Sequence, residues 1–205
     1  LNHSTKKFNF HEKKPNSLAI NFKEDKSNIF IKNLEIASHV VNDIFNESNF
    51  PDLNGDLLTN CLESFKMPPG RGEILSLNKF KIIDDSYNAN PESVKAALDH
   101  LSCFKKYRKF FVFGDMKELG DNEESFHSEI GQYADGKTDI LFTIGKLAKN
   151  AQSNSNNFAL SLHFNDNFSL LEKLNELLTD GDIVLIKGSR SMQLDQLINE
   201  LKNVK

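Results

Sequence analysis

From residue 80 to the C-terminus, short apolar runs alternate with segments of helical periodicity, and this alternation occurs five times. The pattern predicts strands over residues 80–84, 109–113, 140–144, 158–163 and 183–187, and helices over residues 91–101, 123–133, 146–151, 168–178 and 192–201. Strands that are joined through helices form parallel crossover units. The sequence therefore predicts an α/β fold with a doubly wound, mostly parallel sheet, whose functional residues lie at the carboxyl ends of the strands.

A break in regular structure precedes this region. The run MPPGRGE at residues 67–73 contains two prolines and two glycines, which interrupt helices and strands. Before it, apolar residues recur at helical spacing over residues 29–45, and a second helix is predicted over residues 56–65. We therefore expect a domain boundary near residue 70. Because the chain starts at Leu1 and not at methionine, we also expect it to be part of a longer protein.

Composition and charge exclude several classes of function. The formal net charge is -4 and the pI is about 5.9, so a general attraction to nucleic acid or to an anionic membrane is not expected. No apolar run approaches the ~20 residues that cross a bilayer. The two cysteines, Cys61 and Cys103, form no C-x-x-C pair, and the six histidines show no H-x-x-x-H spacing. We expect a cytoplasmic protein without a metal site.

Two adjacent acids end the first predicted strand. Asp84 and Asp85 follow an apolar run. Because successive strand residues point to opposite faces, at least one of the two carboxylates should reach the ligand-binding crevice at the carboxyl ends of the strands. There it accepts ribose hydroxyls or orients a metal-bound water. The alternative is that Asp85 and Asn90 cap the following helix, in which Asn90 suits the N-cap and Pro91 the first helical position.

The last predicted strand ends in the run KGSRS at residues 187–191, directly before a helix. Amide groups at a helix N-terminus, the hydroxyls of Ser189 and Ser191 and the cations Lys187 and Arg190 suit a carboxylate or a phosphate. Lysine is the usual cation of this chain, since three of its 25 basic residues are arginines. A retained arginine suggests a need for the planar guanidinium fork. A solvated loop is the alternative.

A third group of candidates follows the second predicted strand. The loop over residues 114–120 begins and ends with glycine and carries Asp115. On the next predicted helix, His127 is placed where it can face this loop. The alternative for His127 is a surface histidine without a function.

Residues 131–138, GQYADGKT, match the phosphate-binding string G-x-x-x-x-G-K-[ST]. Such a loop needs a strand before it and a helix after it, so that amide groups and the helix dipole converge on the phosphate. Here a predicted helix precedes the string and a predicted strand follows it. We therefore reject a phosphate site and interpret Lys137 and Thr138 as parts of a surface turn.

Four motifs taken together resemble the Mur ligase family. They are GRGE at residues 70–73, IDDSYNANPES at residues 83–93, GDMKELG at residues 114–120 and KGSRSM at residues 187–192. The resemblance extends from about residue 56 to the C-terminus and keeps the order of the motifs. Within the family, the motifs are most similar to those of members that add D-alanyl-D-alanine to UDP-N-acetylmuramoyl-tripeptide in peptidoglycan synthesis.

The resemblance implies an enzyme with a UDP-substrate domain, a central ATPase domain that carries the P-loop, and a C-terminal Rossmann-like domain. Residues 70–205 would be the C-terminal domain, and residues 1–69 the end of the central domain. ATP, with magnesium, would phosphorylate the muramyl peptide, and D-alanyl-D-alanine would attack the acyl phosphate. ATP and magnesium would be bound mainly by the central domain. The chain lacks that domain's P-loop, so it is not expected to ligate alone, and a monomer is expected.

The resemblance also implies roles for individual residues. Arg71 would contact a nucleotide phosphate or the ribose, Asp85 would hold the ribose, and Asn88 would lie close to the terminal phosphates. The dipeptide or the charged intermediate would be received by Lys187, Ser189 and Arg190. Further candidates are Tyr87, Asn90, Asp115 and His127. No catalytic residue and no metal ligand are assigned.

Two alternatives come from other classes of protein. A phosphorylation-receiver domain is also doubly wound, and its acidic pair, phosphoacceptor, hydroxyl and lysine have counterparts in the order Asp84, Asp85, Asp115, Thr143 and Lys187. Against it, the interval between Asp85 and Asp115 has room for one helix and one strand, where a receiver inserts a further crossover. The third interpretation is a non-catalytic binding or scaffold domain with a degenerate site.

Overall fold

The structure, a computed structural model, describes residues 33, 36–37, 40, 67–152 and 157–203. Contacts divide the chain into two units, and the larger one contains Lys66–Lys205. The helices predicted over residues 29–45 and 56–65 lie outside the described residues, except that positions 33, 36, 37 and 40 are helical. Residues 67–152 and 157–203 belong to the larger unit.

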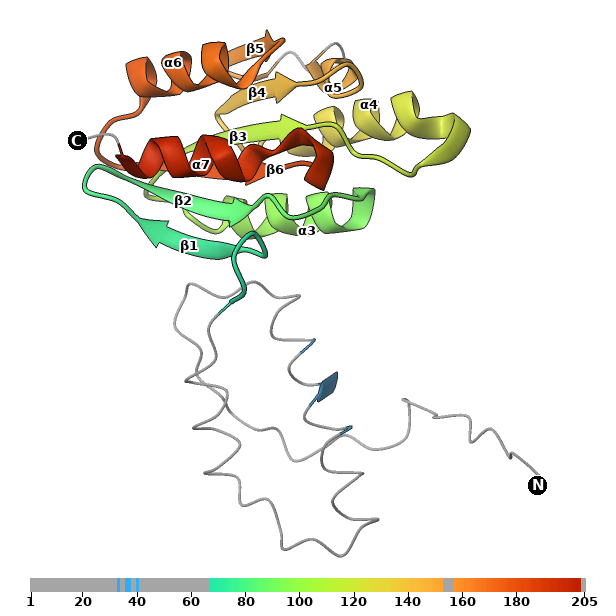
Figure 1. Ribbon diagram of the computed structural model, residues 1–205, viewed down its shortest axis with the longest axis horizontal. Coiled ribbons are helices and arrows are strands. Elements are labelled where there is room, and N and C mark those ends of the chain that lie inside the picture. Colours follow the sequence, from blue (N-terminus) through green and yellow to red (C-terminus); the bar gives the residue numbers. More distant parts are fainter. Residues whose placement is uncertain (1–32, 34–35, 38–39, 41–66, 153–156, 204–205) are drawn as a thin grey trace, which may run out of the picture. The chain divides into compact units, whose positions relative to one another are not determined.

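These residues contain one sheet with the strand order β1-β2-β6-β3-β4-β5 (Figure 1). The strands are β1 (Glu73–Ser76), β2 (Phe80–Asp85), β3 (Arg108–Gly114), β4 (Ile140–Ile144), β5 (Leu160–Phe164) and β6 (Asp182–Lys187). Strands β2 to β6 pair in parallel, and β1 pairs antiparallel with β2. The five predicted strands are therefore confirmed, and β1 is an addition that the sequence pattern did not predict.

Helices cover both faces of the sheet. They are α3 (Pro91–Ser102), α4 (Glu123–Ala134), α5 (Lys149–Gln152), α6 (Asn167–Leu177) and α7 (Leu194–Asn203), with short 3₁₀ helices η1 (Gly120–Asn122) and η2 (Arg190–Met192). Apolar residues of α3, α4 and α5 pack against one face of the sheet, and those of α6 and α7 against the other. This arrangement is the predicted doubly wound α/β fold.

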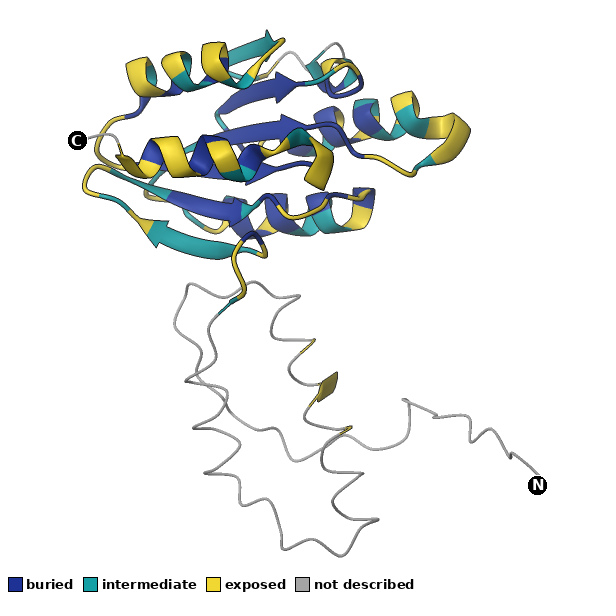
Figure 2. Ribbon diagram, viewed as in Figure 1, coloured by how far each residue is buried: buried dark blue, intermediate teal, exposed yellow. Residues whose placement is uncertain are grey.

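The alternation of side chains along the central strands builds two cores at once. On β3, Phe111 and Phe113 point to the face covered by α3 and α4, whereas Phe110 and Val112 point to the face covered by α6 and α7. Strands β3, β4 and β6 are buried on both sides, while the helices expose their outer faces (Figure 2). This explains why the strands read as continuous apolar runs.

The strand order reverses at β6. The chain passes from β2 through α3 to β3, then to β4 and β5, and returns through α6 to place β6 between β2 and β3. A receiver domain has the flavodoxin-like order 2-1-3-4-5, in which the last strand lies at an edge. Because the last strand lies inside this sheet, the receiver alternative is wrong.

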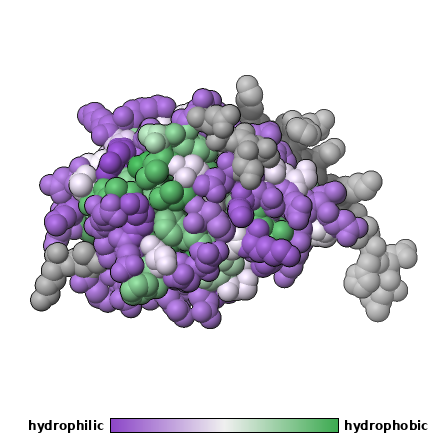
Figure 3. All heavy atoms as spheres, turned by 90° about the horizontal axis from the view of Figure 1, so that it is seen from above, coloured by the Kyte–Doolittle hydropathy of each residue, from purple (hydrophilic) through white to green (hydrophobic). Residues whose placement is uncertain are grey.

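The two edges of the sheet are β1 and β5. Seen from above, the molecule presents a group of hydrophobic side chains surrounded by hydrophilic ones (Figure 3). Phe168 of α6, next to the β5 edge, is 68% exposed. None of the helices in the described part of the chain has the length and hydrophobicity needed to span a bilayer.

Candidate functional site at the carboxyl ends of β2, β6 and β3

Three of the four motifs follow the strands that meet at the reversal of the strand order. Residues 84–93 follow β2, residues 114–120 follow β3 and residues 187–192 follow β6. Ligand sites in open α/β sheets lie at this position. The fourth motif, residues 70–73, leads into β1 and is hydrogen-bonded to the chain after β2. The fold therefore brings the four motifs together at the carboxyl ends of the central strands.

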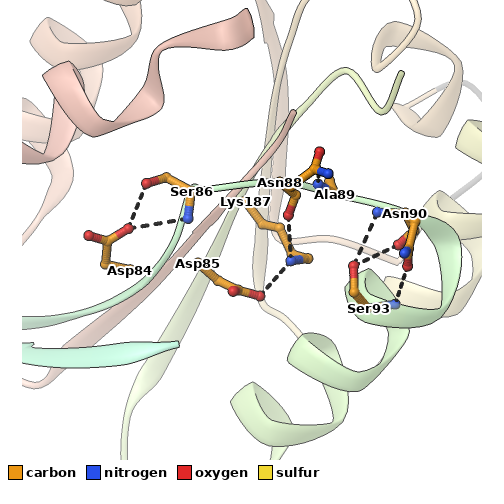
Figure 4. Close-up of polar contacts among 8 residues, drawn as sticks. All are labelled: Asp84, Asp85, Ser86, Asn88, Ala89, Asn90, Ser93 and Lys187. Carbon is orange, nitrogen blue, oxygen red and sulfur yellow. Dashed lines mark hydrogen bonds and ion pairs between the residues drawn. The ribbon is translucent and has the colours of Figure 1, made fainter. Parts of the chain in front are cut away.

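Asp85 and Lys187, at the ends of neighbouring strands, form an ion pair (Figure 4). Lys187 Nζ lies 2.6 Å from Asp85 Oδ2 and donates a second hydrogen bond, of 2.9 Å, to the backbone oxygen of Asn88. The Lys187 side chain is 2% exposed and the Asp85 side chain 20%. Burial raises the pKa of the Asp85 carboxyl, and the Lys187 ammonium acts in the opposite direction. Two residues predicted to serve different ligands are therefore in direct contact.

Asp84 lies on the other side of the strand from this ion pair (Figure 4). Its Oδ1 accepts hydrogen bonds from Ser86 Oγ and Ser86 N, at 2.7 and 3.2 Å, and the residue is buried. The prediction that the two acids point to opposite faces is confirmed. Asp84 fixes the turn after β2, and Asp85 faces Lys187.

Asn88 and Asn90 both bind within their own loop. Asn88 Oδ1 accepts from the backbone N–H of Ala89 at 2.9 Å. Asn90 Oδ1 accepts from the N–H of Ser93 at 2.8 Å, and Ser93 Oγ accepts from the N–H of Asn90 at 3.1 Å. This reciprocal pair is a capping box at the start of α3. The capping alternative is confirmed for Asn90 and is wrong for Asp85, which is not the cap.

The Gly-Arg-Gly segment lies against the chain after β2. Gly70 and Gly72 have φ angles of 76° and 85°, which favour glycine. Gly70 O accepts from the N–H of Tyr87 at 3.0 Å, and the N–H of Gly72 donates to Asp84 O at 2.7 Å. A Cβ atom at Gly70 would lie 3.1 Å from the Tyr87 nitrogen. The segment therefore places Arg71 over Tyr87, with 4.0 Å between Arg71 Cζ and the ring centroid.

The loops after β6 and β3 approach each other closely. A Cβ atom at Gly188 would lie 3.0 Å from Gly114 Cα, so the contact depends on glycine. The N–H of Ser189 donates to Asp115 O at 2.9 Å, and Ser189 is buried. Its Oγ lies 2.9 Å from Ser191 Oγ. These contacts fix the backbone that carries the predicted anion-binding residues of this loop.

Arg190 is exposed at the start of η2. Its NH1 lies 3.4 Å from Asp195 Oδ2, and its Cζ lies 5.9 Å from the centroid of the Tyr87 ring. The structure thus brings Arg190 and Arg71 to the same side chain, Tyr87, which is itself 44% exposed.

Asp115 is buried and holds the loop after β4 in place. Its Oδ1 accepts from the N–H groups of Leu147 and Ala148, at 2.9 and 2.8 Å. Its Oδ2 lies 3.1 Å from Nζ of Lys117, whose side chain is 46% exposed. Asp115 therefore lies at the site, and its oxygens bind the protein itself. Lys117 is an exposed cation that was not predicted as a site residue, although its place in the glycine-bracketed loop could have indicated it.

His127 is buried in α4 and faces the loop after β3, as predicted, so the surface alternative is wrong. Its Nε2 accepts from the N–H of Met116 at 2.8 Å, and its Nδ1 lies 2.6 Å from Glu123 O. This pair of contacts requires a neutral ring with the proton on Nδ1. Burial lowers the pKa of His127. The ring therefore fastens the loop to α4.

The GQYADGKT string is not a phosphate loop. Helix α4 ends at Ala134, within the string, and β4 begins at Ile140, after the string. The predicted order, with the helix before the string and the strand after it, is confirmed. Lys137 Nζ lies 2.9 Å from Asp99 Oδ1 at a turn. The prediction of a surface turn is wrong for Thr138, which is buried and whose hydroxyl donates to Lys109 O at 2.8 Å. Across residues 67–152 and 157–203, no cluster of three or more His, Cys, Asp or Glu side chains could hold a metal ion.

Comparisons with known proteins agree with this geometry. The family model of the Mur ligase glutamate ligase domain matches residues 70–190. UDP-N-acetylmuramoyl-tripeptide--D-alanyl-D-alanine ligase of Bacillus subtilis (strain 168) is 37% identical over 147 residues, which are 68% of this chain and 32% of the relative. The chain thus spans about a third of the length of the curated relatives it matches.

Solved structures give the same result. The MurF ligase of Thermotoga maritima in complex with ADP is 27% identical, with a TM-score of 0.60 over 73% of this chain and 38% of that one. MurF from Acinetobacter baumannii is 24% identical, with a TM-score of 0.71 over 87% of this chain and 38% of that one, and shows the shared fold. Because the family model covers more than half of the chain and its motifs meet at one site, the chain belongs to the Mur ligase family.

Proposed function

We propose that the chain is the C-terminal part of an ATP-dependent ligase that joins D-alanyl-D-alanine to UDP-N-acetylmuramoyl-tripeptide in peptidoglycan synthesis. The main support is that four motifs meet at the carboxyl ends of the central strands. The chain that carries them is 37% identical to a curated UDP-N-acetylmuramoyl-tripeptide--D-alanyl-D-alanine ligase. Residues 70–205 would form the C-terminal domain and residues 1–69 the end of the central ATPase domain. The proposed protein is a cytoplasmic monomer that acts on small molecules.

In this proposal, ATP transfers its terminal phosphoryl group to the carboxylate of the muramyl tripeptide and leaves as ADP. The amine of D-alanyl-D-alanine then attacks the acyl carbon and releases phosphate. Such a reaction requires positioning and stabilisation of charge, which a domain supplies when it closes over the substrates. A bound ADP in the relative from Thermotoga maritima supports the nucleotide, and ATP with magnesium would be held mainly by the central domain.

The residues after β2 would form the nucleotide side of the site. Asp85 would accept a ribose hydroxyl, and Arg71 would bind a phosphate or the ribose. Lys187 is buried against Asp85, so it would act on the nucleotide by orienting that carboxylate. The same ammonium binds the Asn88 carbonyl, which would fix the loop near the terminal phosphates.

The residues after β6 would receive the dipeptide or the charged intermediate. Arg190 is exposed and offers its guanidinium donors to a ligand. Ser189 is buried, and its hydrogen bonds to Asp115 O and Ser191 hold the loop in one conformation. The loop is therefore preorganised around its one exposed cation, Arg190.

The first test uses the native protein, purified from its source cells and identified by peptides from residues 80–120. We expect a chain a little more than twice as long as this one, because the 147 matched residues make up 32% of the curated relative. We expect it to release ADP and to form the extended muramyl peptide when ATP, tripeptide and dipeptide are all present. A native chain of this length without ligase activity would contradict the proposal and support the scaffold interpretation.

A variant of the native protein tests the nucleotide side. Asp85→Asn keeps the shape of the side chain and removes the charge, so we expect KM for ATP to rise by about 10-fold, since bonds to charged groups contribute more than neutral ones. KM for D-alanyl-D-alanine should change less. Glu200→Gln, on the exposed side of α7, is the control and should leave both constants unchanged. Equal effects of Asp85→Asn on both constants would argue against a nucleotide role.

A further inference from the structure

Two of the three arginines of the chain share one aromatic ring. The Cζ atoms of Arg71 and Arg190 lie 4.0 and 5.9 Å from the centroid of the Tyr87 ring, within the range of cation–π contacts. Arg71 belongs to the segment before β1 and Arg190 to η2, so segments that are far apart in the sequence meet at this tyrosine. All three side chains reach the surface.

The third arginine shows what this chain uses arginine for. Arg108 Nε lies 2.8 Å from Asp182 Oδ1, and Arg108 NH2 lies 2.7 Å from Asp182 Oδ2. Lysine cannot form this two-point contact, so arginine is required where two oxygens of one group are bound. In a chain whose other 22 basic residues are lysines, the same need is expected at positions 71 and 190.

The guanidinium forks of Arg71 and Arg190 are available to a ligand. The one ion pair of Arg190 among the described residues is a contact of 3.4 Å with Asp195, and both side chains are exposed. Such pairs contribute little and are easily replaced. Arg71 is exposed, its Cζ lies over the Tyr87 ring, and its guanidinium donates no hydrogen bond to the described residues, so its N–H groups can point to a ligand.

Backbone hydrogen bonds hold in place the segments that carry the three residues. Tyr87 is tied to the arginine segment by its hydrogen bond to Gly70 O. The loop of Arg190 is tied to β3 by the bond from Ser189 N to Asp115 O. Both guanidinium groups carry a positive charge, and the nearby carboxylate of Asp85, on which Arg71 acts electrostatically, is already paired with Lys187. An oxyanion that contacts both arginines would be attracted by both charges.

We propose that Tyr87 is a positioning residue that holds Arg71 and Arg190 on one ligand group, a phosphoryl group. The inference rests on the proposed function and deepens it, because it assigns Arg190 to the phosphoryl group and not to the carboxylate of the dipeptide. Paired guanidinium groups match the oxygens of a phosphoryl group and stabilise the negative charge that they carry during transfer.

The test uses the whole 205-residue chain labelled with ¹⁵N. Its three arginines give three Nε–Hε signals, and Arg71→Lys and Arg190→Lys assign two of them, which leaves Arg108 as an internal control. The probes are inorganic pyrophosphate, ADP and D-alanyl-D-alanine. We expect pyrophosphate and ADP to shift the Arg71 and Arg190 signals with one common dissociation constant, while the Arg108 signal stays in place. If ADP shifts both arginine signals and pyrophosphate shifts neither, the two arginines bind the phosphoryl group as part of the nucleotide.

Variants of the ring separate positioning from a general structural role. We expect Tyr87→Leu to weaken the binding of the phosphoryl probe by about 5-fold, because the cation–π contacts are lost. Tyr87→Phe keeps the ring and should restore binding to within about 2-fold of the wild type. Tyr133→Leu is the matched control, since Lys137 and Lys95 lie over that ring at 4.6 and 5.7 Å. It should leave phosphoryl binding unchanged.

Three results would overturn the inference. A shift of Arg71 alone would leave the nucleotide role intact and remove Arg190 from the phosphoryl site. A shift of Arg190 with D-alanyl-D-alanine and not with pyrophosphate would return it to the dipeptide. No shift of either arginine at millimolar pyrophosphate or ADP would also reject the shared site, whereas the proposed function would still be decided by the ligase assay on the native protein.

Discussion

Lys187 places an ammonium group in a position that is almost closed to water, with Asp85 and one carbonyl as its partners. Removing one partner of a buried ion pair leaves the other charge uncompensated. The Asp85 side chain is 20% exposed, so water partly compensates its charge. We therefore expect Lys187→Met to lower the free energy of unfolding by about 2 to 3 kcal/mol, somewhat less than for a fully buried pair. Urea unfolding of the 205-residue chain measures this change.

The matched control is Lys173→Met, because Lys173 pairs with Glu176 on the surface of α6. Its effect should stay below about 0.5 kcal/mol, since exposed ion pairs contribute little. If the two lysine variants cost the same, the ion pair of Lys187 does not stabilise the site.

His127 gives the stability a pH dependence. Burial lowers its pKa in the folded chain, with Asp115, Glu123 and Lys117 as the charged neighbours, whereas the unfolded chain keeps a value of about 6.5. Below pH ~6.5 the unfolded chain therefore binds more protons, and stability falls with decreasing pH until the folded-state pKa is passed. Protonation of Nε2 also removes the acceptor of the Met116 N–H.

The measurement is urea unfolding at a series of pH values from 7.5 down to 5. We expect His127→Gln, whose side-chain oxygen can accept the same hydrogen bond, to reduce the slope of stability against pH. A residual slope is expected because burial also lowers the pKa of His163. An unchanged slope in His127→Gln would contradict this origin.

The positions of the site residues could be predicted from the sequence, and their partners could not. Asp85, Lys187 and Asp115 follow apolar runs, which marks them as strand-end residues. Their partners lie across the sheet: Lys187 binds Asp85, and Asp115 binds amides that follow β4. Side-chain partners of this kind depend on strand order and register, which no local pattern contains.

At the scale of the elements, Gly131 allows α4 and α5 to touch. A Cβ atom at this position would overlap with the backbone carbonyl of Ala151. Alanine favours an isolated helix over glycine by about 1 kcal/mol, and here the overlap opposes that gain. We expect Gly131→Ala to lower the free energy of unfolding by about 1 to 3 kcal/mol, as overpacking does.

Thermal and urea unfolding check this expectation. Gln132→Ala, at the exposed neighbouring position of the same helix, is the control and should be neutral or slightly stabilising. A Gly131→Ala chain as stable as the wild type would mean that α5 moves away at no cost.

Helix α5 and strand β1 differ from the prediction for physical reasons. Helix α5 was expected over residues 146–151 and starts at Lys149, because Asp115 binds the amides of Leu147 and Ala148 and keeps the preceding residues in a turn. Strand β1 was missed because it has four residues next to a glycine-rich break. It forms by pairing with β2, which is a tertiary effect.

At the scale of the whole molecule, the sequence predicted the doubly wound sheet but not the place of β6 between β2 and β3. The five parallel units look alike in the sequence, so periodicity cannot order them. The position of β6 is nevertheless what creates the site, because it brings Lys187 between Asp85 on one side and the loop of Asp115 on the other. The motifs were predicted to lie at the carboxyl ends of the strands, and the strand order explains why they meet there.

Among the residues that the structure describes, those that form the two hydrophobic cores lie between Ile74 and Leu201. We therefore expect a shortened chain over residues 67–205 to fold by itself and to unfold cooperatively. The chain has no tryptophan, and its three tyrosines, Tyr87, Tyr107 and Tyr133, all lie in this region. Tyrosine fluorescence during urea unfolding thus reports on the same residues in both chains, and the midpoints should agree. A broad or absent transition in the shortened chain would show that its cores depend on the residues before Met67.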